Sequence, residues 1–271
     1  MPEKIAFIGA GSMAEAIISG IREMNVYEKE QVWVTNKENK ERLQYMKDRY
    51  GVRCTAEKAE ALQDAAIVVL ATKPYDLKDA VLDIVPLLQP EQLVISVVAG
   101  ISTDYIGSLL QQNTAIVRVM PNTSASIGMS ATAIAAGEFA ATDDMKKAKA
   151  LFETIGTVEI VDEEAMHTVT SISGSGPAYI YYLVEAMEKA AVNAGLQAEV
   201  AKQLIAQTVL GAGEMLKKSG ENAAALRKKI TSKKGTTEAG IQTLAAHQFQ
   251  QAVIDCVDSA RKRSIELGKQ N

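Results

Sequence analysis

A glycine-rich stretch near the start of the chain is the feature whose residue types and spacing most clearly suggest chemistry. The apolar run at residues 4–8 stops at Gly9 and Gly11, and a helical spacing of apolar residues follows. Gly9 can adopt turn dihedrals that other residues avoid, and Gly11 lets backbone approach a phosphate. With Ala14 completing a Gly-x-Gly-x-x-Ala pattern, the stretch predicts a strand, a tight turn and a helix N-terminus that binds a dinucleotide. A plain strand-to-helix turn is the alternative.

The end of the next expected strand bears on which dinucleotide binds. This strand covers residues 31–35, and Asn36 and Lys37 follow it. NAD-binding folds usually carry Asp or Glu here for the ribose 2′-hydroxyl. Asn36 can donate to a 2′-phosphate and Lys37 or Lys40 can neutralise it, which favours NADP, with NADPH preferred over NADH. Glu38 keeps NAD as an alternative, and a solvated helix start is the other interpretation of the lysines.

Three further apolar runs, at residues 66–71, 93–97 and 115–119, follow at the spacing of crossover connections. Their continuous apolar character is typical of strands buried on both faces of a parallel sheet. The carboxyl ends of such strands share one edge, where ligands bind. Each polar residue there would also suit a plain turn. The positions expected to bind the cofactor are Ile8, Gly9, Ala10, Gly11, Ser12, Met13, Asn36, Lys37, Ala71, Thr72, Lys73, Pro74, Ala99, Gly100 and Asn122.

The pattern changes about residue 162. Strands are expected at 130–136 and 157–161, with a helix at 142–153 between them, and only helical patterns follow. The fold class is therefore α/β: a Rossmann-type dinucleotide-binding domain at 1–162, then an all-helical domain at 163–271. The later helices are more apolar than a small bundle can bury, so we expect a homodimer or a higher homo-oligomer. The expected helices cover 177–193, 198–218, 222–229, 236–246 and 248–267.

Composition narrows the class of protein. Apolar residues make up 47% of the 271 residues and aromatic residues 5%, and the formal net charge is −4. That charge gives no general attraction to nucleic acid or membrane. Cys54 and Cys256 are too far apart for a metal knuckle, so we expect no metal site and no disulfide framework. No apolar run reaches membrane-spanning length and no signal-peptide pattern is present, so we expect a cytoplasmic location.

Two segments of the helical region place small hydroxyl residues and glycines directly before a helix. They cover residues 171–179 and 230–240. Free N–H groups and hydroxyls at a helix start can bind a carboxylate, although ordinary helix capping uses the same residues. Gly174-x-Gly176 is similar to a motif of the hydroxyacid dehydrogenases, but Ile180 stands where those enzymes place a catalytic lysine. This difference counts against alcohol chemistry. His167 and His247 lack a partner at a meaningful spacing and are expected to be structural.

Taken together, these motifs resemble those of pyrroline-5-carboxylate reductase from end to end, at residues 7–14, 71–74, 118–123, 173–179 and 235–237. The resemblance implies NAD(P)H-dependent reduction of L-1-pyrroline-5-carboxylate to L-proline, the last step of proline biosynthesis. It further implies that the helical domain dimerises and supplies the substrate loop. It places the substrate carboxylate at Ser232, Gly235, Thr236 and Thr237, and we expect the hydroxyl of Thr237 to act catalytically beside the ring nitrogen.

Two positions depart from the family pattern. Lys233-Lys234 stands where the family usually has Pro-Gly, and Ser124 stands where it usually has proline. The first departure leaves two alternatives open. One is a reductase of another cyclic imine or imino acid, and the other is a non-catalytic NAD(P)-binding regulatory paralogue.

Overall fold

The computed structural model describes residues 3–111 and 113–269, which form two compact units. Unit 1 comprises the described part of Met1–Ser175 together with that of Ser259–Asn271, and unit 2 is Gly176–Asp258. The predicted domain boundary after residue 162 stays a prediction, because compact units and sequence domains divide a chain by different criteria.

Unit 1 is built on one sheet, whose strand order in the described residues is β3-β2-β1-β4-β5-β6-β7-β8. Neighbouring strands are parallel except β6 and β7, which are antiparallel. The order reverses between β1 and β4, the kind of switch point beside which open α/β sheets bind ligands. The strands are β1 (Lys4–Ile8), β2 (Val32–Thr35), β3 (Arg53–Thr55), β4 (Ala65–Leu70), β5 (Leu93–Ser96), β6 (Ile116–Met120), β7 (Ser130–Ala136) and β8 (Gly156–Ile160).

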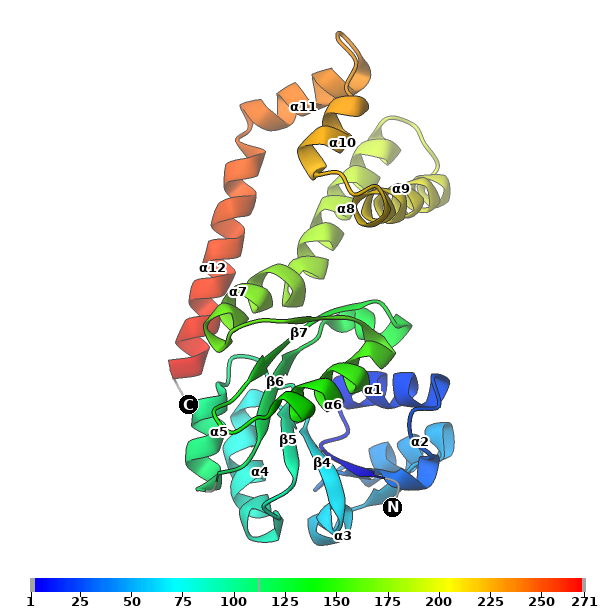
Figure 1. Cartoon of the computed structure of the whole chain (residues 1–271). Coiled ribbons are helices and arrows are strands. Elements are labelled where there is room, and N and C mark those ends of the chain that lie inside the picture. Colours follow the sequence, from blue (N-terminus) through cyan, green and yellow to red (C-terminus); the bar gives the residue numbers. More distant parts are fainter. Residues whose placement is uncertain (1–2, 112, 270–271) are drawn as a thin grey trace. The chain divides into compact units, whose positions relative to one another are not determined.

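Helices cover both faces of this sheet (Figure 1). Side chains alternate between faces along a strand, so Ile5 and Phe7 of β1 point to one side and Ala6 and Ile8 to the other. The first pair packs with α1 (Ser12–Glu23), α2 (Lys40–Tyr50) and α6 (Thr142–Phe152). The second pair packs with α3 (Lys58–Leu62), α4 (Leu77–Ile84) and α5 (Thr103–Leu110). These four side chains of β1 are all buried, as the continuous apolar run predicts.

Short helical turns complete the first part of unit 1. They are the 3₁₀ turns η1 (Lys29–Gln31), η2 (Pro74–Asp76), η3 (Val85–Leu87), η4 (Thr123–Ile127), η5 (Glu153–Ile155) and η6 (Glu163–Ala165), then α7 (Met166–Val169) and the π-helix η7 (Thr170–Gly174). At η6, Glu163 forms an ion pair of 2.7 Å with Arg118 of β6, whose side chain is 2% exposed. The Nδ1 atom of His167 in α7 lies 2.9 Å from Ser264 Oγ, which is consistent with the expected structural role.

Unit 2 is helical throughout. It contains α8 (Gly176–Asn193), α9 (Ala198–Lys218), α10 (Ala223–Lys229), α11 (Thr236–Ala246) and the first part of α12 (Phe249–Lys269). The predicted ranges agree with these helices to within two residues at each end. Within the described structure, α8, α10 and α11 bury no residue, and α9 buries only Ala201 and Ile205. Large apolar side chains such as Leu204 and Ile254 are exposed instead.

Candidate functional site

The turn after β1 requires glycine at its first position. Gly9 has φ +113°, and its N–H donates to the Thr35 carbonyl at 3.0 Å. A Cβ placed on Gly9 would lie 2.5 Å from the carbonyl oxygen of Ala71, at the end of the neighbouring strand β4. The turn therefore passes directly against the backbone of the next strand, and any side chain there would push the two strand ends apart.

Gly11 differs from Gly9 in its surroundings. The nearest atom to a Cβ placed on Gly11 is the Ala71 carbonyl oxygen at 4.0 Å, so the protein itself leaves room for a side chain. Gly11 is the N-cap of α1 and no side chain caps that helix. The N–H groups of the first turn are thus available to an anion, and the helix dipole favours negative charge there. This arrangement fits the pyrophosphate of a dinucleotide.

A hollow of about 420 Å³ opens at this turn, on the carboxyl edge of the sheet. Most positions predicted to bind the cofactor line it, at the ends of β1, β2 and β4. Asp76, Asp79, Ala80 and Asp83, from η2 and α4, line another side of the hollow. The predicted residues in the lining are Ile8, Gly9, Ala10, Gly11, Asn36, Lys37, Ala71, Thr72 and Lys73. The other predicted positions, Ser12, Met13, Pro74, Ala99, Gly100 and Asn122, lie outside this lining, and their roles stay predictions.

Thr72 in the lining carries a buried hydroxyl that forms no hydrogen bond within the described residues. A buried hydroxyl without a partner is costly, so a ligand group that bonds it is favoured. The glycine turn, the uncapped helix start and this buried hydroxyl together fit a dinucleotide.

The end of β2 holds its polar groups in place by local hydrogen bonds. The Oδ1 atom of Asn36 accepts from the backbone N–H groups of Glu38, at 3.2 Å, and Asn39, at 3.0 Å. These bonds fix the side chain and assign its oxygen, which leaves the Nδ2 group as the donor for a ligand. Lys37 follows directly in the same lining.

Arg42 supports the glycine turn and was not predicted from sequence. Its Nε donates to the Ala10 carbonyl at 2.7 Å, and its guanidinium forms an ion pair with Glu15 of α1. Tyr45 and Tyr50 also donate to Glu15, each at 2.9 Å. Burial alone would raise the pKa of Glu15, but these hydrogen bonds outweigh it and hold the pKa below its usual value. The turn is therefore clamped from α2. Sequence could not identify this role, because an arginine in the first turn of α2 has the same local pattern as any other helix arginine.

The amide of Asn122 is used within the protein. Its Oδ1 accepts from the Ser124 N–H at 3.1 Å, and its Nδ2 donates to the Ser173 carbonyl at 3.0 Å. The side chain is buried and ties the end of β6 to the π-helix η7. In this structure Asn122 is thus an anchor between two backbone segments.

In unit 2, the segment before α11 forms a tight turn. The Gly235 N–H donates to the Ser232 carbonyl at 3.0 Å, and Lys234 has φ +62°. A Cβ on Gly235 would lie 2.4 Å from Ser232 Oγ, so a side chain at this position would have to turn the Ser232 hydroxyl aside. Lys233 and Lys234 are the two central turn residues, the positions that Pro-Gly fits best when the second has positive φ. The chain therefore keeps a Pro-Gly-type turn although it carries two lysines there.

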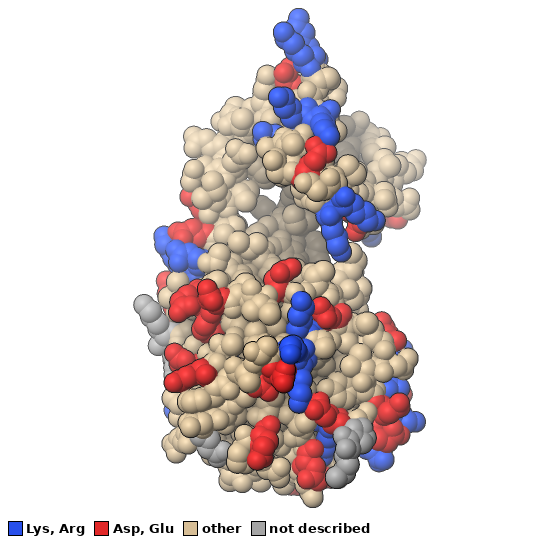
Figure 2. All heavy atoms as spheres, viewed as in Figure 1, with Lys and Arg blue, Asp and Glu red and all other residues tan. Residues whose placement is uncertain are grey.

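Thr236 and Thr237 begin α11, and Gly235 is its N-cap with no side-chain cap. Capping by the Thr237 hydroxyl is therefore not what starts this helix. Glu238 instead accepts from the Lys234 N–H at 2.7 Å, which stabilises the turn from inside the helix. Figure 2 shows Lys and Arg side chains gathered at the end of unit 2 where α10 and α11 meet, and α10 itself ends in basic residues.

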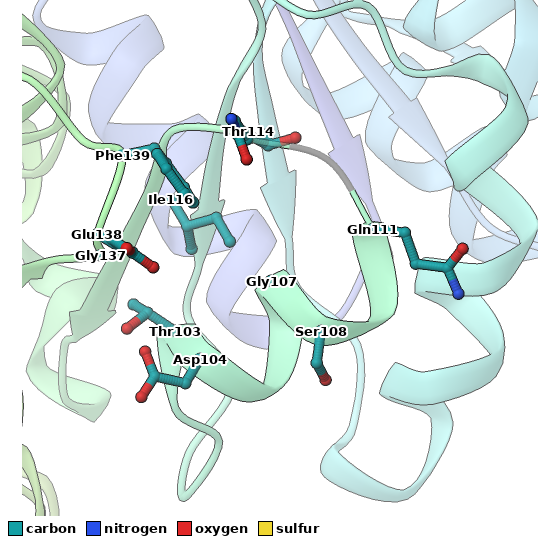
Figure 3. A pocket seen from close by; sticks show the side chains of 11 residues that line it. Thr103, Asp104, Gly107, Ser108, Gln111, Thr114, Ile116, Gly137, Glu138 and Phe139 are labelled. Atoms are coloured by element: carbon teal, nitrogen blue, oxygen red, sulfur yellow. The ribbon is translucent and has the colours of Figure 1, made fainter.

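A second hollow in unit 1, of about 330 Å³, lies beside α5 (Figure 3). Hydroxyl and amide groups line it, together with the carboxylates of Asp104 and Glu138. It shares no residue with the hollow at Gly9.

In the described residues no group of three or more His, Cys, Asp or Glu side chains is placed to hold a metal ion, and no helix is long and apolar enough to cross a membrane.

Comparisons with known proteins agree with this geometry. Residues 163–267 match the family model for pyrroline-5-carboxylate reductase dimerisation, and residues 4–100 match that for coenzyme F420-dependent NADP oxidoreductase. The chain is 46% identical to pyrroline-5-carboxylate reductase 2 of Bacillus subtilis, over 99% of this chain and 96% of that protein. It is 37% identical to the pyrroline-5-carboxylate reductase of Staphylococcus haemolyticus, over 98% of both chains.

Solved structures show the same likeness. The pyrroline-5-carboxylate reductase of Coxiella burnetii superposes with a TM-score of 0.92 at 34% identity, covering 98% of this chain and 99% of that one. The pyrroline carboxylate reductase of Plasmodium falciparum, solved with NADP bound, superposes with a TM-score of 0.88 at 29% identity, covering 98% of both chains. Over its whole length, therefore, this chain belongs to the pyrroline-5-carboxylate reductase family.

Proposed function

We propose that this protein reduces L-1-pyrroline-5-carboxylate to L-proline with NADPH or NADH, the last step of proline biosynthesis. The structural observation that carries the proposal is the hollow at the carboxyl edge of the sheet in unit 1. There, Gly11 is the N-cap of α1 and the Thr72 hydroxyl lacks a partner among the described residues. The family membership of the whole chain supplies the substrate. We assign NADPH as the preferred cofactor because Asn36 and Lys37, rather than a carboxylate, follow β2.

A nicotinamide cofactor held at this edge of unit 1 would supply the hydride that reduces C5 of the imine. A protonated cyclic imine is already electrophilic, so the protein mainly has to hold it at near-attack distance, roughly 3–3.5 Å. We assign the substrate carboxylate to the turn of Ser232 and Gly235 and to the start of α11 at Thr236. Thr237 is the proposed catalytic group, with its hydroxyl near the ring nitrogen. Its freedom from the capping position supports this role.

Residues 1–162 are proposed as the cofactor domain and residues 163–271 as the dimerisation and substrate domain. The exposed apolar side chains of unit 2, among them Leu204, Leu210 and Ile254, support a homodimer or a higher homo-oligomer, because a lone helical unit rarely leaves so much apolar surface in water. Size-exclusion chromatography coupled to light scattering, which measures the molar mass of the protein in solution, tests this oligomeric state. A monomer at micromolar concentration would contradict it.

A cytoplasmic location is also proposed. Cys54 and Cys256 are both free, as expected where thiols stay reduced. Burial raises the pKa of the Cys54 thiol to about 11, so this cysteine is poorly reactive.

The test is a steady-state assay of NADPH and NADH oxidation with pyrroline-5-carboxylate, with proline measured as product. Measuring turnover with six-membered cyclic imines as alternative substrates shows which ring size the protein prefers. We expect turnover with the five-membered imine to exceed turnover with the others. Binding of NADPH without turnover of any imine would contradict the proposal and favour the regulatory paralogue, and faster turnover of another ring would reassign the substrate.

A further inference from the structure

Beside the end of β2 lies a charged pair that the sequence did not point to. Lys58, the first residue of α3, forms an ion pair of 2.6 Å with Asp83 of α4, and both line the hollow at Gly9. Strand β3 pairs in parallel with β2, with Thr55 opposite Thr35, so the start of α3 lies next to the end of β2. That strand end is where a Rossmann-type fold meets the 2′ position of the adenosine ribose.

The charges of this hollow nearly balance. The lining carries the lysines Lys37, Lys58 and Lys73 and the carboxylates of Glu38, Asp76, Asp79 and Asp83. A 2′-phosphate brings up to two negative charges into this setting, so its binding depends on which lysines are locally available and not on a general positive field.

Asp83 is the carboxylate that couples the lysines at the 2′ end. Its hydrogen bond and charge contact with Lys58 lower its pKa, and the charge of Lys37 adds to the effect. Both ammonium groups therefore act on the same carboxylate. The Lys58 side chain is 17% exposed and that of Asp83 is 49% exposed, so the lysine is the more buried partner of the pair.

We propose that Lys58 is a second cation for the 2′-phosphate of NADPH and that Asp83, by neutralising Lys58, limits the preference of the protein for NADPH over NADH. An ammonium group has three N–H donors, so Lys58 can bind a phosphate oxygen while it keeps Asp83. The negative charge of Asp83 then opposes the phosphate through the shared lysine. This inference rests on the proposed function and adds the residues that set its cofactor choice.

Nucleotide affinities test the proposal without catalysis. NADPH and NADH are titrated into the full-length protein and followed by nucleotide fluorescence, and 2′,5′-ADP and 5′-AMP are titrated as competitors. Lys58→Gln is expected to weaken NADPH binding about tenfold, and Asp83→Asn to strengthen it about threefold, while the Kd for NADH changes less than twofold. Lys78→Gln removes the same charge from an exposed site on α4 outside the lining and should change neither affinity.

The double variant Lys58→Gln/Asp83→Asn tests the coupling. If Asp83 acts through Lys58, its NADPH-to-NADH ratio equals that of Lys58→Gln alone, because neighbouring partners are not additive. Additive effects, or equal changes in both nucleotide affinities, would overturn the proposal. The pair is partly exposed, so the variants should fold with nearly unchanged thermal midpoints. A wild-type protein that binds neither nucleotide would instead refute the proposed function, so the two failures are distinct.

Discussion

Replacing Thr72 with valine should stabilise the protein without bound nucleotide and weaken its affinity for the cofactor. Valine keeps the shape of threonine but removes a buried hydroxyl that has no partner in the described chain. An unsatisfied buried polar group costs about 1–3 kcal/mol, so we expect the free protein to gain on the order of 1 kcal/mol. For a domain of this size that corresponds to a rise in thermal midpoint of roughly 2–4 °C.

The same substitution would also delete the hydrogen bond that we propose between the Thr72 hydroxyl and the dinucleotide. One hydrogen bond contributes about 0.5–1.5 kcal/mol net, so the Kd for NADPH should rise about two- to tenfold. The two effects have opposite signs, which a general loss of structure would not produce.

The assay measures thermal midpoint without nucleotide and Kd by fluorescence titration on one preparation. Thr72→Ser is the matched control, because it keeps the hydroxyl and should keep the Kd within about twofold. A valine variant with a lower midpoint and an unchanged Kd would refute the reasoning, since the hydroxyl would then have a protein partner and no role toward the ligand.

Gly11→Val should lower the thermal midpoint only modestly, because a Cβ there meets nothing closer than 4.0 Å although valine is a poorer N-cap than glycine, while the Kd for NADPH rises at least about tenfold; unchanged affinity would remove its phosphate role. Lys234→Gly should relieve the strain of φ +62° and add on the order of 0.5–1 kcal/mol to the free energy of unfolding, and a loss would contradict the turn. Thr237→Val should lower kcat about tenfold with an unchanged midpoint; wild-type kcat would exclude its hydroxyl from catalysis. Glu163→Gln leaves the Arg118 charge buried without its counter-ion and should cost about 3 kcal/mol in urea unfolding, and a cost under about 0.5 kcal/mol would refute the pairing.

The elements of the structure agree closely with those predicted from the sequence where the sequence pattern is strongly periodic. Strand 130–136 and helices 198–218 and 236–246 were predicted to the residue. Strand β3 was not predicted, because three partly exposed residues at the sheet edge are too few to show a period. The antiparallel direction of β7 was also not predicted, since a run of buried residues looks the same for either strand direction.

The site shows a similar division. Gly9 could be predicted because its backbone conformation restricts the residue type directly. Gly11 lies in the lining as its motif predicts, and its contact with a phosphate stays a prediction. Arg42 and the Lys58–Asp83 pair could not be predicted, because a charged residue on a helix has the same local pattern whether it faces solvent or another element. Their roles depend on the pairing of β2 with β3 and on the packing of α2 and α4, which are tertiary contacts.

Transfer of deuterium from nicotinamide C4 to the substrate tests the central claim most directly. The protein is incubated with pyrroline-5-carboxylate and NADPH deuterated at C4 on the transferred face, and the product is analysed by mass spectrometry and proton NMR. The proposed reaction predicts L-proline with one deuterium at C5 for each NADPH oxidised. Oxidation of NADPH without labelled proline, or proline formed without the label, would contradict direct hydride transfer to the imine and with it the proposed function.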